Sequence, residues 1–159
     1  LIIAGVILPV LGKVREFSWR TRARDSVYQI KTAWMSYLTD YREFPDFGNV
    51  RITEMNSNAC MALWSSNLNP RKYIYMEFTT NEVRRGFLDP WRTNYQLALD
   101  NGIAQPNGWD PTPAYDTHIA PPHFQGGATL RQNVGVWCMG QNNGLAGKPN
   151  ETNDDILSW

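Results

Sequence analysis

The fold is decided by the stretch LIIAGVILPVLGKVREFSWRTRARDSVYQIKTAWMSYLTDY, residues 1–41. Its large apolar residues recur in steps of mostly three or four, the spacing of one helix face, at Val10, Val14, Phe17, Val27, Ile30, Trp34, Leu38 and Tyr41. The spacing predicts one helix from about residue 1 to about residue 41, roughly 60 Å long at 1.5 Å per residue. Phe44-Pro45-Asp46 is expected to end it, because the residue before a proline avoids the helical conformation.

The beginning of this helix has unusual features. Residues 1–11 carry no charge, but a helix needs about 20 apolar residues to span a bilayer. No basic region precedes the run and no small-residue cleavage site follows it, so it does not have the form of a signal peptide. It also opens without a capping residue, which predicts a helix cut at its start; the alternative is a core helix at the N-terminus. Pro9 is expected to kink the helix or open it locally.

A helix of this length has too much apolar surface for the rest of the chain to cover. Its N-terminal half is therefore expected to bury that surface in a membrane or against other subunits.

Length and composition indicate one folded domain with a helical extension. Of the 159 residues, 42% are hydrophobic and 19% are charged, which is typical of a globular chain. We divide the chain into an N-terminal helix, residues 1–44, and a head, residues 45–159. Fifteen basic residues balance fifteen acidic ones, so nothing general favours binding to nucleic acid or to an anionic membrane. The charge is uneven, however, because residues 13–24 hold five basic side chains and one acidic side chain.

The head is predicted to combine short helical pieces with a small sheet. Residues 53–67 are expected to form a helix, and residues 79–85 a turn or short helical piece. Strands are expected at 72–78, 94–99 and 130–138. Asp100-Asn101-Gly102 has hairpin-turn chemistry, and the stretch 102–127 is expected to be a long surface loop. The fold class is therefore α+β: a long N-terminal helix packed on a small antiparallel sheet, with an irregular C-terminal loop over 140–155.

The sequence carries no catalytic signature. It has no nucleophile elbow, P-loop, paired-glycine nucleotide motif or histidine-based metal motif, so we do not expect an enzyme. His118 and His123 lie in one proline-rich loop without a metal partner at suitable spacing. Cys60 and Cys138 form no CxxC pair, which excludes the usual zinc, thioredoxin and haem-attachment motifs. Two alternatives stay open for them: a disulfide in an oxidising compartment, or two buried thiols.

Three segments, in order, carry a family pattern. The first is IIAGVILPVLGKVRE, residues 2–16, an apolar stretch with an A-G-x-x-x-P pattern followed by a basic turn. The second is LDPWRTNY, residues 88–95, and the third is VWCMGQNNGLAGKPNETNDDILSW, residues 136–159. Together they resemble the major pseudopilin of type II secretion systems, a member of the broad type IV pilin-like family. The resemblance touches both ends and the middle of the chain.

Particular positions carry this resemblance. Pro9 matches the proline inside the family's N-terminal helix. The family's D-P-W-G-x-P-Y signature is matched by Asp89, Pro90, Trp91 and Tyr95. Arg92 and Asn94 stand where the family has a glycine and a second proline. The family's C-terminal pattern is matched by Gly140, Gly144, Asp154, Asp155, Ile156 and Trp159. The resemblance also implies a further stretch before residue 1, with a processing site and a glutamate.

The resemblance implies a calcium ion in the C-terminal loop. Calcium takes six to eight oxygen ligands from carboxylates, amides and backbone carbonyls, which a loop with glycine turns can supply. The candidate ligands are Asp154, Asp155, Asn142 or Asn143, and backbone carbonyls at Met139 and near Thr152. An asparagine replaces a family aspartate, in a register ambiguous by one residue, so weaker affinity is expected than for a site of three carboxylates. The alternative is a loop held by its own hydrogen bonds.

The function implied by the resemblance is that of a structural subunit of a helical filament, a homopolymer joined through N-terminal helices. The helix would anchor the subunit in the inner membrane, next to an assembly platform, and would later pack in the core of a periplasmic or extracellular filament. The candidate core residues are Leu1, Ile2, Ile3, Val6, Ile7, Leu8, Pro9, Val10, Leu11, Val14 and Phe17. The filament would be either a short secretion pseudopilus or a long surface pilus. The alternative function is a minor pilin-like surface module for binding or adhesion, with a concave aromatic pocket and no polymer.

Overall fold

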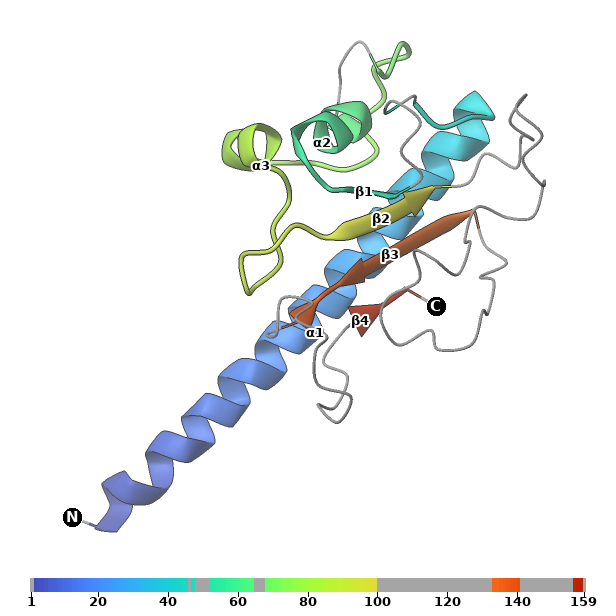
Figure 1. The fold of residues 1–159 in the computed structure, drawn as a ribbon. Coiled ribbons are helices and arrows are strands. Elements are labelled where there is room, and N and C mark those ends of the chain that lie inside the picture. Colours follow the sequence, from blue (N-terminus) through green and yellow to red (C-terminus); the bar gives the residue numbers. More distant parts are fainter. Residues whose placement is uncertain are drawn as a thin grey trace.

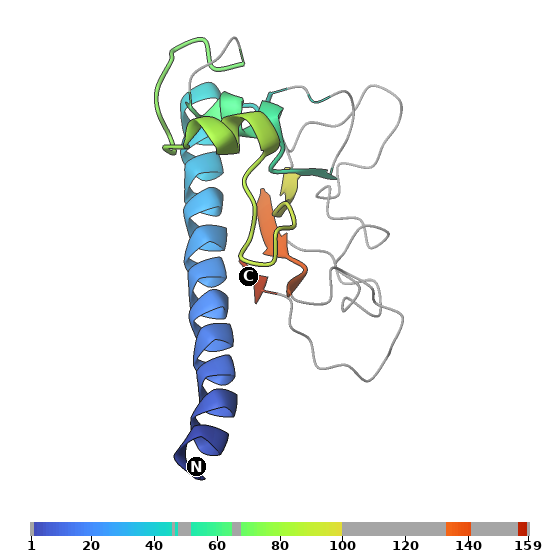
Figure 2. The same cartoon turned by 90° about the vertical axis from the view of Figure 1, so that its left-hand side faces the viewer.

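The computed structural model describes residues 2–45, 47, 52–64, 68–99, 133–140 and 156–158, with side chains from Gly12 onward in the first helix and from Glu54 onward in the first strand. Its elements are α1 (Ile2–Tyr41), β1 (Ile52–Glu54), α2 (Ser57–Trp64), α3 (Thr80–Arg85), β2 (Gln96–Leu99), β3 (Val134–Cys138) and β4 (Ile156–Leu157). The strands form one antiparallel sheet in the order β1-β2-β3-β4. Helix α1 lies along one face of the sheet, and its N-terminal half projects beyond the head (Figures 1 and 2). The predicted α+β class is confirmed.

Helix α1 ends at Tyr41, as predicted, and it is one continuous helix through Pro9. The expected local opening at Pro9 does not occur, and Figure 2 shows α1 without a sharp bend. A proline removes one backbone hydrogen bond, and the bonds of the neighbouring turns keep this backbone helical. Pro9 is therefore compatible with a straight, rod-like projection.

The C-terminal half of α1 supplies one side of the head's core. Its buried residues recur at helical spacing: Ala23, Val27, Ile30, Trp34 and Tyr37. They face the sheet, and Trp34 lies at their centre with no exposed surface. The indole Nε1 of Trp34 donates to the Met55 sulfur at 3.5 Å, and its ring meets the rings of Phe44 and Phe47 at 5.9 and 6.0 Å. This apolar burial holds α1 against the head.

The helix predicted over 53–67 is shorter than expected, and a strand precedes it. Strand β1 pairs with β2 in the register Ile52↔Ala98. Asn56 then ends the strand, because its side-chain Oδ1 accepts the backbone N–H of Ala59 at 3.1 Å and caps α2. The cap explains why α2 begins at Ser57 rather than at Thr53.

The strand predicted over 72–78 is wrong. Tyr73 and Ile74 are adjacent in sequence and both exposed, so the alternation in this segment does not separate a buried face from a solvent face. Side chains hold the segment instead. Tyr41 donates to Asn69 Oδ1 at 2.7 Å, Asn69 Nδ2 donates to the Tyr73 carbonyl at 2.6 Å, and Tyr75 donates to Asp40 at 2.7 Å. Residues 68–75 are thus fixed to the end of α1 without a strand partner.

The remaining elements agree with their predictions where they are described. The helical piece at 79–85 is α3, which begins with a reciprocal cap between Thr79 and Glu82. Strands β2 and β3 occupy the C-terminal parts of the stretches predicted over 94–99 and 130–138. The predicted hairpin turn at 100–102 and the loop at 102–127 lie outside the described residues.

Strand β4 and Ser158 fasten the C-terminal end of the chain to the sheet and to α1. Ser158 donates its backbone N–H to the Val136 carbonyl at 3.0 Å and accepts the Val136 N–H through its hydroxyl, also at 3.0 Å. Lys31 of α1 donates to the Ser158 carbonyl at 3.0 Å. Each of these groups therefore finds a partner although Ser158 is only 2% exposed.

The two cysteines are buried as free thiols, so the disulfide alternative is not realised. Cys60 lies on α2, which follows the edge strand β1, and its thiol points to the Met55 carbonyl at 3.7 Å. Cys138 lies on β3 where that strand pairs with β4, toward the other edge of the sheet. Burial raises the pKa of the Cys60 thiol to about 12, a shift that hydrogen bonding to the Phe87 backbone partly offsets.

We expect the folded protein to be inert toward thiol reagents near pH 8, because the thiolate is the reactive form and both sulfurs are shielded. Both thiols should react once the chain is unfolded in guanidinium without a reductant. The measurement is a colorimetric thiol count before and after unfolding. A count that reaches two only after reduction would show that Cys60 and Cys138 form a disulfide.

Candidate functional site

The side of α1 that faces away from the head carries large exposed apolar residues. The exposed fraction of the side chain is 59% for Val14, 74% for Phe17, 50% for Tyr28 and 39% for Met35. Their separations are multiples of the helical repeat, so these four residues lie along one side of the helix. Val14 and Phe17 belong to the projecting half, and Tyr28 and Met35 to the half bound by the head.

Three threonines lie between these residues, and each bonds its hydroxyl inside the helix; exposed Arg24 lies on the same side, between Thr21 and Tyr28. Thr21 donates to the Phe17 carbonyl at 3.0 Å, Thr32 to the Tyr28 carbonyl at 2.9 Å, and Thr39 to the Met35 carbonyl at 2.8 Å. A hydroxyl used in this way no longer requires water or a polar partner outside. We call the resulting surface the outer stripe; it consists of Val14, Phe17, Thr21, Tyr28, Thr32, Met35 and Thr39.

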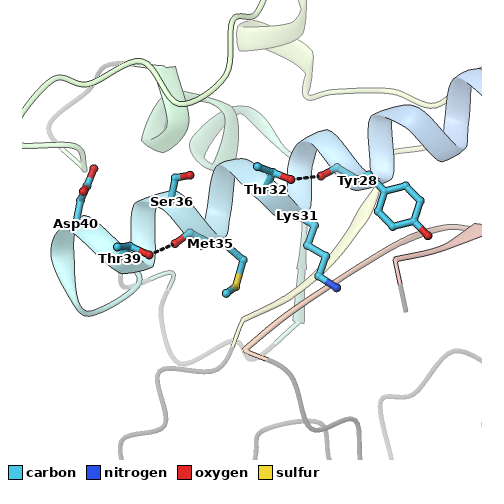
Figure 3. Close-up of a pocket in the computed structure, with 7 residues that line it drawn as sticks. All are labelled: Tyr28, Lys31, Thr32, Met35, Ser36, Thr39 and Asp40. Carbon is cyan, nitrogen blue, oxygen red and sulfur yellow. Dashed lines mark hydrogen bonds between the residues drawn. The ribbon is translucent and has the colours of Figure 1, made fainter.

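The head-bound part of the outer stripe borders a shallow hollow of about 690 Å³ (Figure 3). Its described lining comes entirely from α1, namely Tyr28, Lys31, Thr32, Met35, Ser36, Thr39 and Asp40. The charged members are engaged by the head: Lys31 donates to the Ser158 carbonyl, and Asp40 accepts the Tyr75 hydroxyl. Burial also lowers the pKa of Lys31. The middle of the hollow is thus left to apolar and internally bonded side chains.

The predicted signature turn is built around Asp89. Its carboxylate Oδ1 accepts the backbone N–H groups of Trp91 at 2.9 Å and Thr93 at 2.8 Å, which closes a tight turn between the bridged residues Leu88 and Asn94. Asp89 is 4% exposed, and within the described part of the chain its second oxygen, Oδ2, is buried without a hydrogen bond. Burial therefore raises the pKa of this carboxyl, although the backbone N–H groups of Thr93, Trp91 and Arg92 oppose the shift.

The signature turn packs against α1. The Trp91 ring meets the Trp19 ring edge to face at 6.2 Å, and the Arg15 guanidinium lies over Trp19 at 4.4 Å. Tyr95 is 1% exposed; burial raises its pKa, and its hydrogen bond with Ser26 of α1 partly offsets this. The four predicted residues Asp89, Pro90, Trp91 and Tyr95 therefore lie in one turn that joins the sheet to the middle of α1. The sequence did not identify Trp19 as their partner.

The predicted calcium ligands fall almost entirely outside the described residues. Met139 is described, half-buried directly after β3, whereas Asn142, Asn143, Thr152, Asp154 and Asp155 are not. The ends of the intervening segment are nevertheless brought together, because Cys138 pairs with Ile156. In the described part of the chain, no three His, Cys, Asp or Glu side chains gather as metal ligands.

Of the predicted filament-core residues, the structure describes the side chains of two. Leu1 lies outside the described residues, and Ile2–Leu11 are described only as backbone of α1. Val14 and Phe17 are both strongly exposed on the outer stripe. The stripe also extends to Tyr28, Met35 and the three threonines, which were not predicted from the sequence. The continued helical spacing of Tyr28, Thr32 and Met35 is the signal that could have identified them.

No protein-family model, curated protein or solved structure matches this chain. The pseudopilin resemblance thus depends on the three sequence segments alone. Among the described residues, no helix combines the length and the apolar character needed to cross a bilayer.

Proposed function

We propose that this protein is a structural subunit of a helical filament that assembles through α1. The observation that carries the proposal is the outer stripe, which runs along α1 from the projecting half into the head-bound half. Phe17 alone exposes 74% of its side chain to water. Arg24 divides the stripe into two apolar parts, Val14 to Thr21 and Tyr28 to Thr39. Large apolar side chains this exposed on a projecting helix are unfavourable in water and are typical of a surface that another molecule covers.

The composition of the outer stripe favours another helix as its cover. Large side chains alternate with small ones, as Phe17 with Thr21, Tyr28 with Thr32, and Met35 with Thr39. Each pair has the i, i+4 separation that forms the ridges and grooves of packed helices. Threonines with internally bonded hydroxyls allow backbones to approach closely, as small residues do between helices in apolar surroundings.

The shape of the subunit favours an open polymer of identical chains. The described part of the head lies against α1 from about Trp19 onward, and the helix projects beyond it toward the N-terminus (Figure 1). In the proposed arrangement, a second subunit displaced along the helix axis lays its α1 against the outer stripe of the first. A displaced contact of this kind does not close on itself and therefore generates a helical filament.

The decisive test is electron microscopy of material sheared from cells that produce the chain. Phe17→Glu places a charge in the outer stripe and is expected to abolish filaments, because burying an unpaired carboxylate between helices is strongly unfavourable. Arg20→Gln is the matched control: it changes net charge by the same amount at an exposed position of α1 outside the stripe. Filaments of Phe17→Glu as abundant as those of the control would contradict assembly through this surface.

We further propose that calcium clamps the C-terminal loop of the subunit, with the ligands predicted from the sequence. The support is that β3 and β4 pair at Cys138 and Ile156, so the loop that carries Asp154 and Asp155 starts and ends at one place. An ion that binds only the folded state stabilises it by mass action.

Chelation is therefore expected to lower the melting temperature of the protein and to fray the filaments. Asp154→Asn, which removes one charged ligand, should melt near the chelated value and respond little to added calcium. Equal melting temperatures with calcium and with chelator would contradict the clamp.

Before assembly, we propose that the subunit is held in the inner membrane at an assembly platform by the apolar beginning of α1. The finished filament would lie in the periplasm as a secretion pseudopilus or outside the cell as a surface pilus. Loss of secretion after deletion of the gene, without surface filaments in the parent cells, would assign the first use. Long filaments sheared from the parent surface would assign the second.

A further inference from the structure

A group of aromatic and basic side chains lies where α1 leaves the head. We call it the collar and define it by Arg15, Trp19, Leu88, Trp91 and Arg92. Arg15 stacks on Trp19 at 4.4 Å and Trp19 meets Trp91 at 6.2 Å, so helix and signature turn contribute to one surface. Leu88 is 40% exposed and Arg92 is exposed at the tip of the turn. The collar is on a different side of α1 from the outer stripe, because Trp19 and Phe17 are two residues apart on the helix.

The helix segment at the collar is rich in positive charge although the chain as a whole is neutral. Residues 13–24 hold five basic side chains and one acidic side chain, and Arg92 adds another cation from the head. In the described part of this band the one ion pair is Arg20–Glu16, at 3.0 Å. That pair neutralises the single acidic residue. Arg15 and Arg22 lie on the same side of α1 as Trp19, and with Arg92 they place three cations on the side of the two tryptophans, whereas Lys13, Arg20 and Arg24 lie on other sides of the helix.

Tryptophan with arginine is the combination found at membrane–water interfaces. The amphipathic indole rings prefer the headgroup level, and guanidinium groups extend to phosphates while their stems remain in apolar surroundings. A cluster of cations next to an apolar helix segment also attracts anionic lipid. The neighbouring sequence supplies such a segment, since residues 1–11 are uncharged.

We infer that the collar is a membrane-docking surface that binds anionic phospholipid headgroups and seats the head on the bilayer before assembly. This inference rests on the proposed membrane-held state of the subunit and adds the head's own contact with lipid. The signature turn, through Trp91 and Arg92, is then a lipid-binding element as well as a structural one.

Distances along α1 specify the orientation that this contact requires. From Leu11, the end of the uncharged run, Arg15 is about 6 Å along the helix and Trp19 about 12 Å. The headgroup layer is only about 5–8 Å deep on each side of the hydrocarbon. An upright helix would hold Trp91 above this layer, whereas a tilt of about 20–40°, within the range seen for membrane helices, brings it down. The helix must therefore lean toward the collar.

Spin labels on the full chain test whether α1 tilts toward the collar. Leu88→Cys carries the label in the collar, and Phe17→Cys carries it on the outer stripe; both replace an exposed apolar side chain. The native cysteines are fully buried and do not compete for the label. On vesicles of phosphatidylcholine and phosphatidylglycerol, the Leu88 label should be protected from a water-soluble relaxation agent at least as well as the Phe17 label. A protected Phe17 label with a fully accessible Leu88 label would show an upright helix and overturn the inference.

Vesicle binding tests the lipid chemistry. Arg92→Gln should weaken binding to phosphatidylglycerol vesicles about fivefold and leave binding to pure phosphatidylcholine unchanged. Arg85→Gln, at an exposed position of α3, is the control for net charge and should bind as the parent chain does. Equal binding of the two variants would overturn the role of Arg92.

The outcomes also separate this inference from the proposed function. If the chain binds vesicles but the Leu88 label stays in water, the collar contact fails while the membrane-held state stands. If that label is immobilised only in filaments, the collar is a contact between copies and the inference is overturned. If the chain binds vesicles of neither composition, the membrane-held state fails and the collar contact fails with it.

Discussion

Replacing Gly86 with alanine is expected to lower the free energy of unfolding by about 2–6 kcal/mol, a large part of the stability of an ordinary domain. Gly86 has φ 95° and ψ 165°, a backbone conformation that residues with a Cβ rarely adopt. A Cβ built there lies 2.7 Å from both the Met55 carbonyl oxygen and Asn94 Oδ1. The backbone carbonyl cannot rotate away as a flexible side chain could.

The position of Gly86 makes the strain costly. Its N–H donates to the Glu82 carbonyl at 2.8 Å and ends α3, and the next residue, Phe87, donates to the Met55 carbonyl at 2.7 Å. Phe87 in turn stacks on Tyr95 at 5.3 Å. A shift that relieves the alanine therefore disturbs the join between α3, β1 and the signature turn.

Gly12 provides a matched control for the glycine change. It lies in α1, and a Cβ added there meets nothing within 4 Å. Gly12→Ala is expected to leave the stability unchanged or to raise it by up to about 1 kcal/mol, since alanine favours helix more than glycine does. Denaturant unfolding followed by circular dichroism measures both variants. Similar midpoints for Gly86→Ala and the parent chain would contradict the strained conformation.

The sequence predicted the long helix well because α1 has a strong and repeated signal. Its core-facing residues, such as Val27, Ile30 and Trp34, follow the helical period, and Pro45 marks the end. The same period also runs along the opposite side of the helix through Phe17, Tyr28 and Met35. Apolar spacing alone does not distinguish a side that meets the head from a side that meets another molecule.

The head was harder to predict because local patterns there compete with long-range contacts. Residues 72–78 alternate like a strand, but the tyrosine hydroxyls at positions 37, 41 and 75 fix this segment to α1 through bonds that no local pattern encodes. Strand β1 is only three residues long and is separated from the capping Asn56 by Met55 alone, so the helical pattern of the apolar residues in α2 led to the prediction of a helix over both. Burial raises the pKa of Tyr37 to about 12.

The candidate site likewise contains some features that the sequence predicts and others that depend on long-range contacts. The motif Asp89-Pro90-Trp91 and the exposed Val14 and Phe17 could be identified from sequence, since each depends on neighbours in the chain. The contact of Trp91 with Trp19 could not, because it joins residues far apart in the sequence across the helix–sheet packing. The internal bonds of Thr21, Thr32 and Thr39 are local, but they become visible only once the helix and the side-chain rotamers are known.

Asp89→Ala is expected to destabilise the protein by about 2–4 kcal/mol, because two backbone N–H groups lose a carboxylate acceptor. Asp89→Asn retains an acceptor oxygen for the N–H groups of Trp91 and Thr93, and it should remain within about 1 kcal/mol of the parent at neutral pH. The comparison separates the geometric role of the side chain from its charge. Denaturant unfolding of the three proteins measures it, and equal loss in both variants would contradict a turn held through Oδ1.

The pH dependence of the free energy of unfolding tests the buried carboxyl of Asp89 more directly than stability at a single pH. Burial raises the pKa of Asp89 in the folded state, so between the unfolded and folded pKa values the folded protein binds more protons than the unfolded chain. The stability that this group contributes is therefore fully present below the unfolded pKa, near 3.9, and is lost as the pH rises through the folded value. Relative to Asp89→Asn, which does not titrate, the parent should gain stability as the pH falls toward 4. A difference between the two that is independent of pH would show that Oδ2 finds a partner when ionised, and that the buried carboxylate carries no penalty at neutral pH.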